Sequence, residues 1–183
     1  MPLSDDLDLT VRKLLVPTYP APWRGFTDIT RVMERDPAAF RALVEEMLAP
    51  HRADPPDAVV AVESCGYVFG APMAYELGSR LILARRAGKL PRPTLRHRYR
   101  AVGIGPAPDR EMEVHTDAIV AGMRVLVVDD VLASGGTVLA ALDLVQRAQG
   151  VPCAVSVAVE LVRFDARASI RERRVPLFAA LRL

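Results

Sequence analysis

The segment 125–145 places an apolar run, two carboxylates, a glycine-rich turn and a helix-forming run in immediate succession. The run Val125–Val128 is short and rich in β-branched residues, which is typical of a parallel strand buried on both faces. Because an unpaired carboxylate is costly to bury, we expect Asp129 and Asp130 to lie at the carboxyl end of this strand. Open α/β sheets place their ligands at that edge. The segment therefore predicts an α/β fold with a binding site beside the two aspartates.

The turn after the aspartates has the composition of a phosphate-binding loop. It consists of Ala133, Ser134, Gly135, Gly136 and Thr137. Glycine lets the backbone approach an anion, while the N–H groups and the dipole of the following helix favour negative charge. The patterns of a triphosphate P-loop and of a dinucleotide site, Gly-Lys-Ser/Thr and G-x-G-x-x-G, are both missing here. Carboxylates suit sugar hydroxyls or Mg²⁺, so we predict a ribose 5-phosphate site. The alternative is a solvated acid pair before a helix N-terminus.

This segment resembles the phosphoribosyl pyrophosphate (PRPP) motif of the type I phosphoribosyltransferases, and the chain from about 16 to 161 is most similar to the adenine phosphoribosyltransferase branch of that family. The other matching segments are Phe26–Thr30, Gly66–Pro72, Gly88–Pro91 and Glu113–Ile119. The resemblance implies a doubly wound, mostly parallel α/β sheet with a small hood. It also implies transfer of the phosphoribosyl group from PRPP to a purine-like base, adenine or a related one, with release of pyrophosphate in purine salvage.

The family resemblance further implies roles for individual residues. Asp129 and Asp130 would hold the ribose hydroxyls, the turn 133–137 the 5-phosphate, and Lys89 the leaving pyrophosphate, which makes Lys89, Asp129 and Asp130 the predicted catalytic residues. The predicted pyrophosphate contacts are Ser64, Cys65, Gly66, Arg86 and Lys89, and the predicted base contacts are Trp23, Phe26 and Leu161. Mg²⁺ would bind with PRPP near the two aspartates through water, without a direct protein ligand. The alternative role for Lys89 and Arg86 is surface charge.

Several positions depart from the family pattern. Cys65 replaces an arginine of the relatives, so a guanidinium fork for the diphosphate is missing and only the backbone N–H groups near Gly66 remain. A nucleophilic role for Cys65 is not favoured, since the sequence places no histidine beside it. The loop 99–108 lacks the glutamate and the second tyrosine of the relatives' Tyr-x-Leu-Glu-Tyr-Gly. The base loop also differs around Trp23, for which simple packing is the alternative. These departures support a second hypothesis, a catalytically impaired PRPP- or nucleotide-binding regulator or sensor.

Hydrophobic periodicity predicts the remaining elements. The predicted strands are 58–63, 81–86, 111–115, 125–130, 154–161 and an edge strand over 175–181. The predicted helices are 8–15, 37–48, one from about 67, and 138–145. The region 92–109 is expected to be a mobile surface loop because of its glycine and proline. Arg96, Arg98 and Arg100 would bring replacement charge to the phosphates if they share one face of a strand, whereas a solvated face is the favoured alternative.

Length and composition exclude several classes of protein. At 183 residues the chain fits one phosphoribosyltransferase-like domain over 1–183, with a hood from about 1–35 and a mobile loop at about 87–110. No stretch approaches about 18 uninterrupted apolar residues and the start is acidic, so we expect a cytoplasmic protein with no membrane partner. The net charge of +2 gives no large basic face and hence predicts no nucleic-acid partner. The expected partners are the small-molecule substrates, PRPP and a purine-like base, and a second copy of the chain in the homodimer that the family implies.

Overall fold

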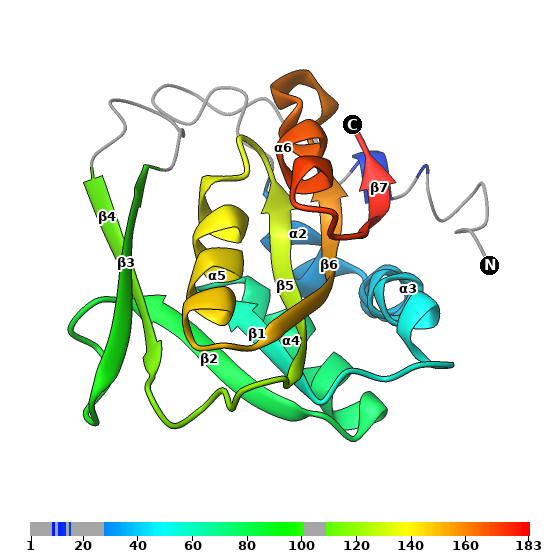
Figure 1. Ribbon diagram of the computed structural model, residues 1–183. Coiled ribbons are helices and arrows are strands. Elements are labelled where there is room, and N and C mark those ends of the chain that lie inside the picture. Colours follow the sequence, from blue (N-terminus) through cyan, green and yellow to red (C-terminus); the bar gives the residue numbers. More distant parts are fainter. Residues whose placement is uncertain (1–8, 10, 14, 16–27, 101–108) are drawn as a thin grey trace.

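The computed structural model describes residues 9, 11–13, 15, 28–100 and 109–183, and this part of the chain forms a seven-stranded sheet with helices on both faces (Figure 1). The strand order is β3-β4-β2-β1-β5-β6-β7. The strands are β1 (Ala58–Val62), β2 (Arg80–Arg86), β3 (Thr94–Arg100), β4 (Asp109–His115), β5 (Arg124–Leu132), β6 (Val151–Glu160) and β7 (Leu177–Arg182). Strand β1 is buried along its whole length, as expected of its continuous apolar run.

The parallel strands gather their carboxyl ends at one edge of the sheet. β1 pairs in parallel with β2 and with β5, β5 with β6, and β6 with β7. β3 and β4 form an antiparallel hairpin that joins the sheet where Arg85 and Arg86 of β2 pair with Glu113 and Met112 of β4. The doubly wound, mostly parallel sheet predicted from the sequence is therefore confirmed.

Helices cover the sheet on both faces, and each face has its own core. The helices are α2 (Thr30–Arg35), α3 (Pro37–Leu48), α4 (Gly66–Leu77), α5 (Gly136–Arg147) and α6 (Ala166–Glu172), with short 3-10 turns η1 (Ala49–His51) and η2 (Val162–Phe164). Val59 and Leu126 pack with residues of α3 and α4, whereas Val60 and Val127 pack with residues of α5. Successive residues of a strand point to opposite faces, so apolar strands such as β1 and β5 need a helical layer on each side.

Local sequence features place two of these helices. Asp36 begins α3, because its carboxylate accepts hydrogen bonds from the backbone N–H groups of Ala38 and Ala39 at 3.0 and 2.9 Å. In α4, a Cβ on Gly70 would lie 2.5 Å from the Cβ of Ala61 in β1, so glycine permits the close approach of the two elements. This contact fixes the N-terminus of α4 at the carboxyl end of β1.

The segment 94–100 corrects the sequence analysis, which assigned it to a loop over 92–109. It forms β3, whose inward positions Leu95 and Tyr99 pack against the core on the α5 face. The third inward residue, His97, is polar, so the alternation of apolar and polar residues was too weak to predict a strand. The six strands that were predicted are all present.

Some predictions fall on parts of the chain that the structure does not describe. Trp23, Phe26 and the loop 101–108 lie outside the described residues. The described residues between 9 and 15 are helical, in agreement with the helix predicted over 8–15. No helix in the described part of the chain has the length and apolar character needed to cross a membrane.

Candidate active site

The aspartate pair lies in the last four residues of β5, at the carboxyl end of the strand where the sequence predicted it. β5 continues to Leu132, and Asp129 pairs with Val157 of β6 and is only 4% exposed. Asp130 is half-buried, and its backbone N–H donates to Asp129 Oδ1 at 2.9 Å. Burial raises the pKa of Asp129 well above its ordinary value of 3.8, and the charge of Asp130 raises it further. A bound proton, a cation or a hydroxyl donor therefore stabilises Asp129 more than it would stabilise an exposed carboxyl.

The turn 133–137 joins β5 to the N-terminus of α5, which begins at Gly136. Gly135 has a φ of +82°, and a Cβ there would lie 3.1 Å from the Cβ of Ala166 in α6. Both conditions favour glycine. The N-cap residue is Gly135, which has no side chain to cap the terminus, and the first N–H groups and the dipole of α5 are directed at the turn. Figure 1 shows the turn at the upper end of β5, close to α6. Its geometry suits an anion.

The turn 64–66, between β1 and α4, lies directly against Asp129. A Cβ on Gly66 would lie 3.1 Å from Asp129 Oδ1 and 3.2 Å from Asp129 Cα, so a larger residue would displace the carboxylate. Cys65 is half-buried beside the pair, and burial together with the charge of Asp130 raises the pKa of its thiol. A protonated thiol is a poor nucleophile, in agreement with the sequence analysis. The fold therefore brings the predicted pyrophosphate turn and the aspartates together.

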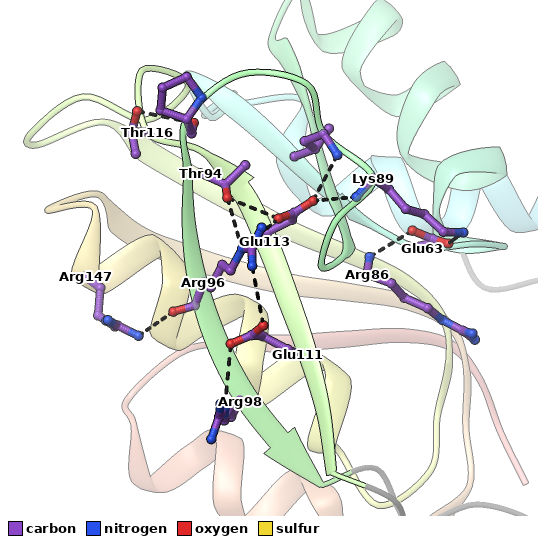
Figure 2. A network of polar contacts seen from close by, with 12 residues as sticks. Glu63, Arg86, Lys89, Thr94, Arg96, Arg98, Glu111, Glu113, Thr116 and Arg147 are labelled. Carbon is purple, nitrogen blue, oxygen red and sulfur yellow. Dashed lines mark hydrogen bonds and ion pairs between the residues drawn. The ribbon is translucent and has the colours of Figure 1, made fainter.

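The carboxylate of Glu63 contacts residues of β2 and of the following turn (Figure 2). The Lys89 ammonium donates to Glu63 Oε1 at 2.8 Å, and the backbone N–H of Arg86 donates to Glu63 Oε2 at 2.9 Å. The guanidinium of Arg85 lies 3.6 Å from the same carboxylate, while the Arg86 side chain points away from it. Glu63 directly precedes Ser64 and is joined to it by a cis peptide bond. The Lys89 side chain thus ends beside the turn 64–66.

Two carboxylates that contact Lys89, Glu63 and Glu113, were not predicted as site residues. Glu113 lies in β4 and accepts hydrogen bonds from the backbone N–H groups of Lys89 and Leu90. The sequence contains one signal of its role, a charged residue whose two sequence neighbours in β4 are buried. That signal did not identify the partner, because residue 113 and residue 89 are brought together only by the pairing of β4 with β2.

The alternating arginines of β3 face the carboxylates of β4 rather than the phosphate turn. The pairs, by the shortest distances, are Arg96 with Glu113 (3.0 Å), Arg98 with Glu111 (3.7 Å) and Arg100 with Asp109 (2.9 Å). All three arginines are exposed. They lie on one face of a strand, but their charges are compensated there, which agrees with the solvated face that the sequence analysis favoured.

The base side of the site is described only at Leu161. Leu161 follows β6 and is buried in the core that α3 and α4 line. The preceding residue, Glu160, accepts from the guanidinium groups of Arg167 and Arg182 at 2.9 and 3.0 Å. The hydrogen bond from Arg167 lowers the pKa of Glu160 in spite of burial, which acts in the opposite direction. This ion pair ties β6 to α6 and β7 immediately beside Leu161.

Metal binding depends on the aspartate pair. Among the described residues, no group of three or more His, Cys, Asp or Glu side chains could hold a metal ion. Asp129 and Asp130 are two hard oxygen donors, which suits Mg²⁺ when water or a bound ligand supplies the remaining oxygens.

Comparison with known proteins gives a consistent result. The model of the phosphoribosyl transferase domain matches residues 36–174. The chain is 43% identical over 155 residues to an adenine phosphoribosyltransferase of Streptomyces galbus, covering 85% of this chain and 82% of the relative. It is 37% identical over 166 residues to an adenine phosphoribosyltransferase of Chloroflexus aurantiacus, covering 91% and 92%.

Solved structures agree with the sequence relatives. The crystal structure of adenine phosphoribosyltransferase from Rhodothermus marinus superposes with a TM-score of 0.82 at 34% identity and covers 97% of this chain and 99% of that one. The enzyme from Giardia lamblia, complexed with 9-deazaadenine, superposes with a TM-score of 0.84 at 29% identity and covers 96% and 97%.

Proposed function

The chain belongs to the phosphoribosyl transferase family, and on that premise we propose that it transfers the phosphoribosyl group of PRPP to a ring nitrogen of adenine or a related purine and releases pyrophosphate. The observation that carries this proposal is the meeting of the turn 64–66, Asp129 and the turn 133–137 at the carboxyl ends of β1 and β5. This arrangement offers one place for a diphosphate, one for a ribose and one for a 5-phosphate in the order in which PRPP carries them.

In the proposed reaction the bond from the ribose C1 to the pyrophosphate oxygen breaks, a bond from C1 to the purine nitrogen forms, and the proton of that nitrogen is released to water. Pyrophosphate leaves with the electron pair of the broken bond. The N–H groups of the turn 133–137 and the dipole of α5 bind the 5-phosphate, while Asp129 and Asp130 accept the ribose hydroxyls. Lys89 and the backbone of the turn 64–66 stabilise the charge that develops on the leaving diphosphate. Catalysis then depends mainly on positioning and charge stabilisation.

We assign Mg²⁺ to the same site as a companion of PRPP. Its chemical contribution when bound is to neutralise part of the diphosphate charge. Asp130 is the better placed of the two aspartates to bind it through water, since it is half-buried whereas Asp129 is buried. Oxygens of PRPP and water supply the other ligands in this proposal.

The base is assigned to the side of the site where Leu161 follows β6, with Trp23 and Phe26 as further contacts. The two aromatic residues rest on the family resemblance alone. Support for adenine comes from the relatives, which are named adenine phosphoribosyltransferases and share 37–43% identity with this chain. The alternative of an impaired PRPP sensor is not favoured, because these relatives are named as enzymes.

We also propose a homodimer in the cytoplasm. Four apolar side chains are exposed on two adjoining elements, Val68 and Tyr75 on α4 and Leu81 and Leu83 on β2, and we call this set the α4–β2 patch. We take it as the interaction surface because exposed apolar patches mark such sites. The thiols of Cys65 and Cys153 are both free, which suits a reducing compartment.

The test is pyrophosphate release when the protein is mixed with PRPP and Mg²⁺, with adenine, hypoxanthine, guanine, xanthine and pyrimidines as acceptors. We expect release with adenine or one related purine, and loss of at least about 100-fold in kcat/KM for Asp130→Asn. Asp109→Asn, an acid on the outer hairpin, is the matched control and should leave the rate within about twofold. PRPP binding by calorimetry without release for any base would instead support the sensor, and absence of PRPP binding would reject both functions.

A further inference from the structure

Glu113 is a carboxylate at the centre of a polar network that joins β4 to the turn carrying Lys89 (Figure 2). Its side chain is 0% exposed. Oε1 accepts from the backbone N–H groups of Lys89 at 2.8 Å and Leu90 at 2.9 Å. Oε2 accepts from Thr94 Oγ1 at 3.1 Å and from Arg96 Nε at 3.0 Å. The buried carboxylate of Glu113 thus accepts from two successive backbone N–H groups of the turn and from the side chains of Thr94 and Arg96 in β3.

These contacts keep Glu113 ionised. Burial by itself raises the pKa of Glu113, but the backbone N–H groups of Gly88, Leu90 and Lys89 and the hydroxyl of Thr94 outweigh burial and lower it to about 2. Two successive N–H donors need an acceptor with free lone pairs in a fixed place, which an ionised carboxylate supplies. Glu113 is therefore an ionised acceptor for the turn at neutral pH.

The turn delivers Lys89 to the diphosphate side of the site. Gly88 has a φ of +86°, so the chain reverses there and directs Lys89 back toward β1. The Lys89 ammonium then reaches Glu63 Oε1 at 2.8 Å, one residue before the turn 64–66. Glu113 fixes the backbone of Lys89, and Glu63 meets the end of its side chain.

We propose that Glu113 is a positioning residue for the diphosphate subsite, which holds the 88–90 turn so that the ammonium of Lys89 lies beside the turn 64–66. The inference rests on the proposed function, because it assigns Lys89 to the pyrophosphate. Strand pairing alone does not account for a carboxylate at residue 113, since its neighbours Met112 and Val114 are buried and apolar and an apolar residue there would avoid the cost of burying a charge.

The test is a double-mutant cycle between Glu113→Gln and Lys89→Ala, with KM for PRPP and KM for adenine measured for each variant. Glu113→Gln keeps the size of the side chain but replaces one acceptor oxygen with a donor. We expect it to raise KM for PRPP about tenfold while KM for adenine changes less than about twofold. In the Lys89→Ala background the same substitution should have no further effect on KM for PRPP, because the residue that it positions is gone.

The matched control is Glu111→Gln. It removes another carboxylate of β4, one that pairs with the exposed Arg98. It should leave KM for PRPP within about twofold. If Glu113→Gln does not fold, Glu113→Asp replaces it in the cycle, since it keeps the charge and shortens the reach, and we expect a smaller increase of the same kind.

The outcomes separate the inference from the function on which it rests. Equal effects of Glu113→Gln with and without Lys89, or equal rises in both KM values, would show a merely structural role and overturn the inference while the enzyme remains active. No pyrophosphate release by the wild-type protein would overturn the proposed function itself.

Discussion

The fold removes Asp129 from water, although water stabilises the charged form of its carboxyl group. Its pKa is raised, so the folded state binds a proton at this site more readily than the unfolded state does. The contribution of Asp129 to stability therefore falls as pH rises from its unfolded value of 3.8 through its folded pKa. Such a group is expected at a functional site, where charge is held in place for a ligand.

We predict that Asp129→Asn stabilises the protein in the absence of PRPP by about 1–2 kcal/mol at pH 8 and has little effect at pH 4, because the amide carries no charge to bury. The same variant should lose about 100-fold or more in kcat/KM. Urea unfolding at the two pH values measures the first effect, and pyrophosphate release measures the second. A variant less stable than wild type at pH 8 would contradict the conclusion that burying this charged carboxylate destabilises the folded protein.

Cys65 is the residue of the predicted pyrophosphate turn at which the family resemblance implies an arginine. Its side chain lies beside Asp130 and Asp129, where a guanidinium would have two carboxylate partners and could reach a diphosphate. We predict that Cys65→Arg lowers KM for PRPP by about three- to tenfold. Cys65→Ser removes the thiol without adding a charge and should leave KM for PRPP within about twofold. Unchanged or weaker PRPP binding by the arginine variant would place residue 65 away from the diphosphate.

At the scale of elements, the position of α4 against β1 controls where the turn 64–66 lies. The contact is made at Gly70, where an added Cβ would fall 2.5 Å from the Cβ of Ala61. Because both atoms belong to rigid elements, neither a rotamer change nor a small loop movement can relieve the overlap. The separation of α4 from β1 is therefore set by the absence of one side chain.

We predict that Gly70→Ala lowers the free energy of unfolding by about 2–3 kcal/mol. Gly78→Ala is the matched control, since Gly78 has a φ of +65° but no atom within 4 Å of an added Cβ, and it should cost only about 1 kcal/mol. Chemical denaturation of both variants gives the comparison. Equal losses would mean that the close contact between α4 and β1 costs no more than the strained backbone conformation at Gly78.

The β3–β4 hairpin forms the edge of the sheet on the far side of β2. Its outer face pairs arginines with acids, and its inner face carries Leu95 and Tyr99 against the core under α5. The buried Glu113 connects the hairpin to the turn that carries Lys89. One hairpin thereby contributes to the sheet edge and the core and holds the turn that we assign to the diphosphate.

At the scale of the whole molecule, the parallel sheet brings together residues that are far apart in the chain. The turn 64–66 follows β1 and Asp129 lies in β5, and these strands are neighbours because β5 pairs with β1. The carboxyl ends of both strands meet at one edge, where a crevice for a ligand forms. The α4–β2 patch lies on the helix that follows the turn 64–66 and on the strand that neighbours β1.

We predict that the combined substitutions Tyr75→Glu and Leu81→Glu weaken self-association by about 100-fold or more, because they place charge in the centre of the α4–β2 patch. Tyr75 is 84% exposed, so the substitution should leave the fold intact. Sedimentation velocity over a range of concentrations measures the effect. Val120→Glu, an exposed apolar residue outside the patch, is the control. A monomeric wild-type protein, or a variant that stays dimeric, would contradict the assignment.

The sequence by itself determined most strands of the sheet, the long helices α3, α4 and α5 and the turn 133–137, whereas the short helices α2 and α6 were not predicted. The apolar run before Asp129, the glycines at 135 and 136 and the following amphipathic helix predicted β5, its turn and α5, because strand period, turn conformation and helix start are local properties. The order of these elements was also sufficient for the α/β class. Only weakly periodic β3 was missed among the described strands.

Tertiary structure alone decided which charges meet. The burial of Asp129 depends on β6 lying beside β5, and the contacts of Glu113 with Lys89 depend on β4 pairing with β2. Arg96 and Arg98 looked like free cations in sequence, but the hairpin supplies each with an acid. A partner on another element has no local sequence pattern, since the free energy of an ion pair or a buried carboxylate is set by distance and solvent exposure, which arise only when the elements pack.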